Sequence, residues 1–92
     1  MPQSFEWDND KATANYLKLG ISFSEASAVF RDAFAIEGID PIHSAGELRL
    51  ITIGVAHTGR LLTVCHTYRV NKIRIINARK ATRLERRIYE EG

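Results

Sequence analysis

The chain has 92 residues, enough for one domain, and its hydrophobic fraction of 45% and charged fraction of 26% are ordinary for a folded globular protein. Its single cysteine, Cys65, excludes a disulfide within the chain, which favours a cytoplasmic location. No apolar run approaches the roughly 18 residues of a membrane helix, and the acidic N-terminal segment lacks the basic start of a signal peptide, so neither membrane insertion nor secretion is expected.

Two helices are predicted at the N-terminus. The first covers residues 8–19, because Asp8 is a good N-cap and Gly20 can adopt the left-handed conformation that ends a helix. The second runs from Ser22 to about residue 31 or 32, and the Ser22 to Glu25 spacing is that of a capping box. A short strand over residues 33–37 and a loop rich in turn-forming residues follow.

Three strands are predicted next, over residues 47–56, 60–68 and 72–77, and their short connections imply antiparallel neighbours. Asn71 is expected to take a left-handed conformation in the last turn. A final helix begins near Thr82, which forms a second capping box with Glu85, and Leu84 and Ile88 are expected to anchor it.

The predicted fold class is therefore α+β, with two N-terminal helices, an antiparallel sheet of about four strands and a C-terminal helix. Neither an internal repeat nor a composition break divides the sequence. A single domain over residues 1–92 is expected.

The net charge of +2 conceals two parts of opposite sign. Residues 60–92 hold nine Lys or Arg against three acidic residues, a net charge of +6, and residues 1–59 hold four basic and eight acidic residues, a net charge of −4. Positive charge gathered at one end favours a phosphate-rich partner. A solvated helix surface is an equally good interpretation of the same basic residues.

The sequence contains no motif typical of a metal or nucleotide site, because no two histidines stand four residues apart and no glycine-rich phosphate loop occurs. No cofactor is therefore expected. What remains is a set of arginines, Arg49, Arg74 and Arg79, whose planar guanidinium groups suit phosphate. Such groups can stabilise a phosphorane when an RNA 2′-hydroxyl attacks the neighbouring phosphate, a reaction that needs no metal.

The remaining candidate residues fall into two groups. The candidate proton carriers for this chemistry are His43, Glu47 and Tyr89. The candidate RNA-binding residues are Lys72, Lys80, Arg83 and Arg86.

Each candidate also has a purely structural interpretation. Glu47 and Arg49 can form a surface ion pair worth less than about 1 kcal/mol. His43 can bond a turn carbonyl, and Tyr89 can close the core with its ring. The spacing of Thr82 and Glu85 favours a capping role for Glu85 over a catalytic one.

Five stretches of sequence span nearly the whole chain in a fixed order. They are FEWDNDKA at 5–12, ISFSEA with VF within 21–30, DPIHSAGELRLITIG at 40–54, GRLLTV at 59–64 and RIINARKATRLERRIYE at 74–90. In this order they resemble the BrnT family of bacterial type II toxins, small ribonucleases with a fold related to RelE. Three positions depart from the family pattern: Leu19 stands where Lys-His-Gly is usual, His66 where tyrosine is common, and Asn77 where serine is common.

The resemblance implies RNA cleavage that arrests translation. It also implies a partner, a small BrnA-like antitoxin with a ribbon-helix-helix DNA-binding domain. Two toxins and two antitoxins would form the complex, which would bind operator DNA through the antitoxin and repress its own operon.

Three functions stay open at this point. The first is a metal-independent endoribonuclease toxin that uses the arginines named above. The second is a non-catalytic nucleic-acid-binding or ribosome-binding module with salt-sensitive affinity. The third is an interaction subunit whose basic surface meets only an acidic partner.

Overall fold

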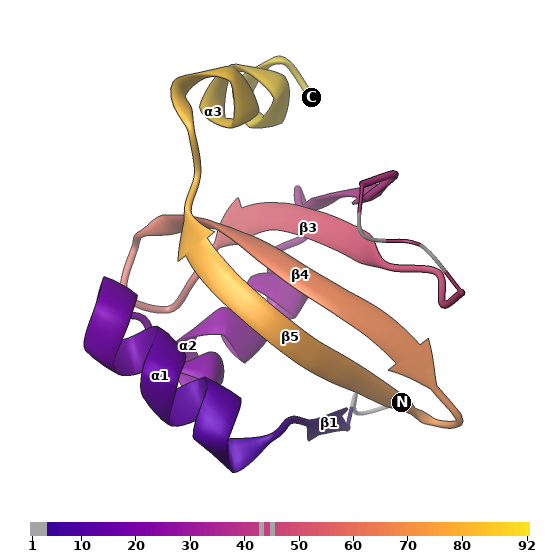
Figure 1. Cartoon of the computed structure of the whole chain (residues 1–92). Coiled ribbons are helices and arrows are strands. Elements are labelled where there is room, and N and C mark those ends of the chain that lie inside the picture. Colours follow the sequence, from indigo (N-terminus) through magenta and orange to yellow (C-terminus); the bar gives the residue numbers. More distant parts are fainter. Residues whose placement is uncertain (1–3, 43, 45) are drawn as a thin grey trace.

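The computed structural model describes residues 4–42, 44 and 46–92. Its elements, in chain order, are β1 (Phe5–Glu6), α1 (Asn9–Leu19), α2 (Phe23–Ala28), the 3-10 helix η1 (Val29–Arg31), β2 (Ile36–Ile39), β3 (Leu50–Val55), β4 (Leu61–Arg69), β5 (Lys72–Lys80) and α3 (Arg83–Glu91). The strands form one sheet in the order β1-β5-β4-β3-β2, with α1 and α2 on one face and α3 beyond the other (Figure 1). The predicted α+β class is confirmed.

The sheet differs from the four antiparallel strands that were predicted. Strand β1 is an additional strand that pairs parallel with β5, with Phe5 opposite Ile73 and Glu6 opposite Arg74. The sheet is therefore mixed and has five strands. The prediction missed β1 because two residues are too few to carry an alternating pattern. The β2–β3, β3–β4 and β4–β5 pairs are antiparallel, as predicted.

Several strand limits also differ from the prediction, and two of them move candidate residues. Strand β5 continues to Lys80, so Arg79 lies inside the strand rather than at its exit. Strand β3 begins at Leu50, so Glu47 and Arg49 precede it. Strand β2 begins at Ile36 because Asp32 closes a turn before it, accepting the backbone N–H of Phe34 at 2.9 Å.

The main core lies between the sheet and the pair α1 and α2. Its buried members are Ile21, Phe23, Ala26, Val29, Ala56, Leu62, Val64, Ile75 and Ala78. Asn15 of α1 is buried in the same layer, and its side chain donates to the carbonyls of Ile21 and Ala78 at 2.9 and 3.0 Å. Gly54 lets η1 approach β3, since an added Cβ would lie 2.8 Å from Val29 Cγ1. These contacts fix one face of the sheet and leave the other more open.

Local signals placed the ends of α1 and the last turn correctly. The Asp8 side chain accepts from the backbone N–H groups of residues 10 and 11, and Gly20 has a φ of 72°. Asn71 has a φ of 62°, as expected for its turn.

Of the two predicted capping boxes, only the C-terminal one forms. Thr82 and Glu85 bond each other's backbone N–H at 3.1 and 2.9 Å. At the start of α2 the Ser22 hydroxyl accepts the Glu25 N–H, but the Glu25 carboxylate binds Arg60 and Thr58 instead of the Ser22 backbone. The reciprocal half of that box was therefore wrong.

Helix α3 is held differently from the prediction. It contains no buried residue, and Leu84 and Ile88 are 64% and 41% exposed, so their predicted role as anchors was wrong. Its position beyond the open face of the sheet is clear in Figure 1. Among the described residues, no helix has the length and apolar character that crossing a membrane requires.

Candidate functional site

The face of the sheet turned away from α1 and α2, called here the outer face, carries a series of polar side chains. Leu62 and Val64 of β4 belong to the main core, and successive strand residues point to opposite faces, so Thr63 and Cys65 lie on the outer face. Their partners across the β4–β5 pair are Arg79 and Asn77. Cross-strand partners share a face, so all four side chains lie together.

These residues line a cavity of about 170 Å³ on the outer face. Its lining consists of Asp40, Ile51, Thr63, Cys65, Asn77 and Arg79. Thr63 and Cys65 form a buried floor, being 2% and 6% exposed. Asp40 enters from the loop after β2, and its Oδ2 lies 4.0 Å from the Cys65 sulfur. Burial raises the pKa of the Cys65 thiol, which therefore stays protonated near neutral pH.

Arg79 is fixed at this cavity by Glu85 of α3. Arg79 Nη1 lies 2.6 Å from Glu85 Oε1, and Nη2 lies 2.9 Å from Oε2. The Thr63 hydroxyl also donates to Oε1, at 2.9 Å. The hydrogen bond from Arg79, above all, lowers the pKa of Glu85 from 4.5 to about 2. Glu85 is therefore ionised and orients Arg79, while acting at the same time as the predicted helix cap.

The other two arginines of the predicted site lie on the same face but at different distances from the cavity. Burial raises the Cys65 pKa, and the charges of Arg49 and Arg79 oppose that rise, so both guanidinium groups lie near the sulfur. Arg74 alternates with the buried Ile73 and Ile75, which places it on the outer face. It stands about 16 Å from Arg79 along β5, and it binds Glu6 at 3.0 Å.

The two predicted proton carriers that the structure describes, Glu47 and Tyr89, do not line the cavity. His43 lies outside the described residues. Glu47 pairs with Arg69 at 3.1 Å rather than with its neighbour Arg49.

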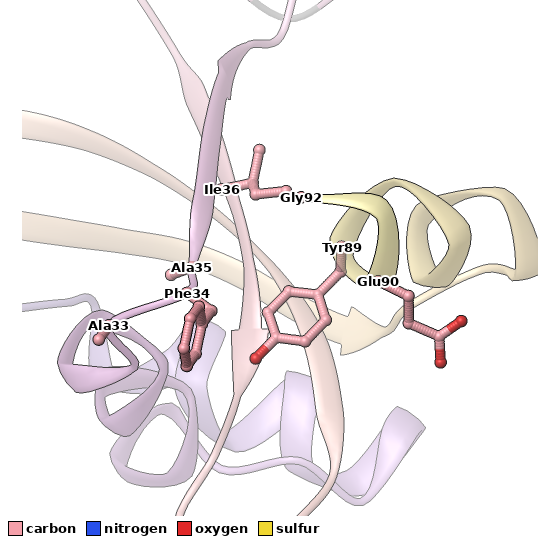
Figure 2. Close-up of a pocket in the computed structure, with 7 residues that line it drawn as sticks. All are labelled: Ala33, Phe34, Ala35, Ile36, Tyr89, Glu90 and Gly92. Carbon is pink, nitrogen blue, oxygen red and sulfur yellow. The ribbon is translucent and has the colours of Figure 1, made fainter.

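Tyr89 lines a separate cavity of about 470 Å³ between α3 and the start of β2, seen in Figure 2. Its hydroxyl donates to Asp32 at 2.6 Å, and this bond raises the pKa of Tyr89. The side chain is thereby engaged at the edge of the sheet, away from Arg79.

The predicted RNA-binding residues lie at the two ends of β5 and on α3. Arg83 and Arg86 are exposed on α3, close in sequence to Arg79. Lys80 is also exposed, but its strand partner Leu62 belongs to the main core, so Lys80 lies on the face opposite the outer face. Lys72 is exposed at the opposite end of β5. Positive charge therefore extends along the whole length of that strand.

Sequence reasoning missed five residues of this site. They are Asp40, Thr63, Cys65, Asn77 and Glu85 in its role as partner of Arg79. Polar residues alternating with apolar ones in β4 and β5 were the available signal for Thr63 and Asn77. Asp40 had no such signal, because only the folded chain brings its loop to the sheet.

The part of the chain that the structure describes holds no group of three or more His, Cys, Asp or Glu residues arranged to bind a metal ion.

Comparison with known proteins gives two related findings. A family model described as "Ribonuclease toxin, BrnT, of type II toxin-antitoxin system" matches residues 7–85. The fold is similar to that of the crystal structure of the Brucella abortus ribonuclease toxin, BrnT, with a TM-score of 0.63 and 19% sequence identity over 89% of this chain and 100% of that one. At this identity the likeness concerns the fold alone. A search of the curated proteins found no match.

Proposed function

Because the chain belongs to the BrnT family of ribonuclease toxins of type II toxin-antitoxin systems, we propose that it is a metal-independent endoribonuclease that arrests translation by cutting RNA in the cytoplasm. The observation that supports this most is the position of Arg79. Its guanidinium stands at the edge of a polar cavity, oriented by Glu85 and still 43% exposed. An oriented and accessible cation is what a phosphodiester needs in its transition state.

In the proposed reaction the RNA 2′-oxygen attacks the adjacent phosphorus, the bond from phosphorus to the 5′-oxygen breaks, and a 2′,3′-cyclic phosphate and a 5′-hydroxyl result. Arg79 stabilises the extra negative charge on the non-bridging oxygens, with Arg49 as the second nearby charge. Arg74 stands too far along β5 for the same phosphate, so it binds a neighbouring one.

Two protons move in this reaction, one from the 2′-hydroxyl and one to the leaving 5′-oxygen. His43 and Glu47, in the segment between β2 and β3, are the proposed carriers. Tyr89 is the weakest of the three original candidates, because its hydroxyl is bound to Asp32. Lys72, Arg83 and Arg86 hold the flanking phosphates and make binding salt-sensitive.

The proposed partner is a small ribbon-helix-helix antitoxin, with two copies of each protein in the complex and operator DNA bound through the antitoxin. Charge supports an acidic inhibitory segment, because residues 60–92 carry a net charge of +6. Such a segment would cover the same surface that RNA needs.

The deciding experiment is cleavage of an end-labelled RNA by the purified protein in excess chelator. We expect fragments with 2′,3′-cyclic phosphate ends. Arg79→Ala should lower kcat by about 10² to 10³, whereas Arg74→Ala should mainly raise KM. Arg31→Ala is the matched control, because Arg31 is exposed on η1, away from the outer face. Undiminished cleavage by both Arg79→Ala and Arg74→Ala would refute the assignment.

A non-catalytic RNA-binding or ribosome-binding module is the second candidate. One observation favours it: two acidic groups at the cavity are poorly matched to proton transfer near neutral pH, because the pKa of Glu85 is lowered to about 2 and burial raises the pKa of the Cys65 thiol. This function predicts RNA affinity that falls steeply with salt and no cleavage at any salt concentration.

A further inference from the structure

We propose that the 170 Å³ cavity beside Arg79 is a base-binding subsite that receives one cytosine of the RNA strand and prefers it to uracil. The inference rests on the proposed function in one respect only, namely that RNA lies along the outer face. It adds the base that the site selects.

The size of the cavity supports a single ring. A cavity of about 150 Å³ in a protein interior accommodates one benzene molecule. The cavity here, at about 170 Å³, is slightly larger, which suits the six-membered ring of a pyrimidine better than the two rings of a purine. Ile51 and the buried sulfur of Cys65 supply apolar surface for the faces and edges of that ring.

The polar lining supports cytosine rather than uracil. A carboxylate such as that of Asp40 only accepts hydrogen bonds, and its two oxygens have about four acceptor positions, so it can take a donor from a ligand in addition to the Ile42 N–H. Cytosine presents the N4 amino donor to a carboxylate, as in known pairings of Asp or Glu with cytosine. In the same orientation uracil presents the O4 acceptor to the Asp40 oxygens and is repelled, and it would have to turn in the cavity to offer its N3–H to Asp40.

Asn77 completes the recognition from the other strand. It lies in β5 opposite Cys65 and offers an amide N–H to the ring N3 or O2 acceptors of cytosine. Single-stranded RNA is commonly read through hydrogen bonds to these Watson–Crick edges. Arg79 belongs to the same lining, so a base held here brings its own phosphate to the guanidinium.

The test measures binding without cleavage. Fluorescein-labelled hexamers of 2′-O-methylcytidine and of 2′-O-methyluridine are titrated with the protein at fixed salt, because the methyl group blocks the attacking hydroxyl. We expect the cytidine hexamer to bind about tenfold more tightly. Asp40→Asn preserves an oxygen that can accept the Ile42 N–H, now bonded at 3.2 Å, but introduces an amide donor that suits uracil O4. This variant should reduce the preference below about threefold.

Two further variants sharpen the result. Asn77→Ala, at an exposed strand position, should weaken binding of the cytidine hexamer about fivefold. Lys72→Ala, at the far end of β5, is the control and should weaken both hexamers by the same factor. Thermal melting of each variant verifies that it is folded.

Equal affinity of the wild-type protein for the two hexamers would overturn the subsite, as would an unchanged cytosine preference in both Asp40→Asn and Asn77→Ala. The proposed ribonuclease function fails separately. Cytosine preference without cleavage in the chelator assay would sustain the subsite and refute the enzyme, whereas cleavage without the preference would do the reverse.

Discussion

Arg79 and Glu85 are joined by two parallel hydrogen bonds of 2.6 and 2.9 Å that connect strand β5 to helix α3. A guanidinium and a carboxylate in this arrangement share one plane, so Glu85 determines the direction in which Arg79 presents its remaining N–H groups. Since α3 buries no side chain, the same pair also helps to hold the helix over the outer face.

Because Arg79 binds Glu85 through two hydrogen bonds, we expect that a positive charge alone is insufficient at position 79. Arg79→Lys keeps the positive charge but loses the planar fork that binds Glu85 and phosphate together. We expect kcat for RNA cleavage to fall by about 10- to 100-fold, with a smaller change in KM. Steady-state kinetics on a short RNA measure this. A lysine variant with wild-type kcat would contradict the role of the fork.

The free energy of unfolding should depend on Glu85 in a pH-dependent way. Glu85→Gln retains a residue that serves in a capping box, so it removes the ion pair and leaves the cap. The pKa of Glu85 falls from 4.5 to about 2 on folding, so its stabilisation is complete above about pH 4.5 and is lost as the pH falls through 2.

We expect Glu85→Gln to cost about 2 kcal/mol at pH 7 and clearly less at pH 3. Urea unfolding of both proteins at the two pH values gives the comparison. The same difference at pH 3 and pH 7 would show that the charge of Glu85 is not responsible.

The burial of His66 should make the free energy of unfolding depend on pH in a second, higher pH range. It is fully buried, its Nε2 meets the Thr52 hydroxyl at 2.8 Å, and its Nδ1 has no partner among the described residues. Burial lowers its pKa from 6.5 to about 4. The unfolded chain therefore binds a proton between pH 6.5 and 4 that the folded chain rejects, and stability falls as the pH falls through this window.

The expected loss from His66 is about 2 kcal/mol between pH 7.5 and pH 5. His66→Phe keeps a ring against Phe30 and should remove this part of the pH dependence. His57→Gln, which removes an exposed histidine, is the control. If His66→Phe unfolds with the wild-type pH dependence in guanidinium titrations, burial of the neutral imidazole is not the cause.

The ion pair of Arg60 and Glu25 should contribute to stability at a place remote from the outer face. Glu25 is only 6% exposed, and Arg60 Nε binds it at 2.8 Å while Nη2 binds the Gly20 carbonyl at 3.0 Å. Arg60→Ala leaves this carboxylate without its cation and should lower the temperature of thermal unfolding clearly. Arg69→Ala breaks the exposed pair with Glu47 and should cost less than about 1 kcal/mol. Equal losses in thermal unfolding would refute the distinction.

We expect the Tyr89 hydroxyl to restrain the motion of helix α3 rather than to change the overall stability. Tyr89→Phe removes the 2.6 Å bond to Asp32, one of the polar contacts that hold α3 to the rest of the protein. Amide hydrogen exchange in residues 83–91 should accelerate, and exchange in β4 should not change. Arg87→Ala, an exposed change on the same helix, serves as the control. Unaltered exchange in α3 would mean that the Asp32 bond does not restrain the helix.

The sequence predicted best what depends on neighbouring residues. Asp8, Gly20, Asn71 and Thr82 all act as expected, because a cap or a left-handed turn needs only a few residues of chain. Strand β1 was missed because its two residues carry no alternating pattern and its partner β5 lies far away in the sequence. The capping box at Ser22 failed for a related reason, since Arg60 competes for the Glu25 carboxylate only once the chain is folded.

The residues of the candidate site show the same difference between local signals, which were predicted, and long-range contacts, which were not. Arg79 was predicted from its charge and its place near the end of a strand, but its partner Glu85 was interpreted only as a helix cap. Both roles hold together, because one oxygen of Glu85 accepts the Thr82 N–H while both oxygens accept from Arg79. Asp40 was not predicted, since its loop reaches the cavity only through the pairing of β2 with β3.

The pairing of β1 with β5 also affects when the protein becomes complete during synthesis. Phe5 and Glu6 are translated well before their strand partners, Ile73 and Arg74. Strand β1 must therefore wait until β5 has left the ribosome before it can join the sheet. A nascent chain that stops short of β5 cannot assemble this sheet.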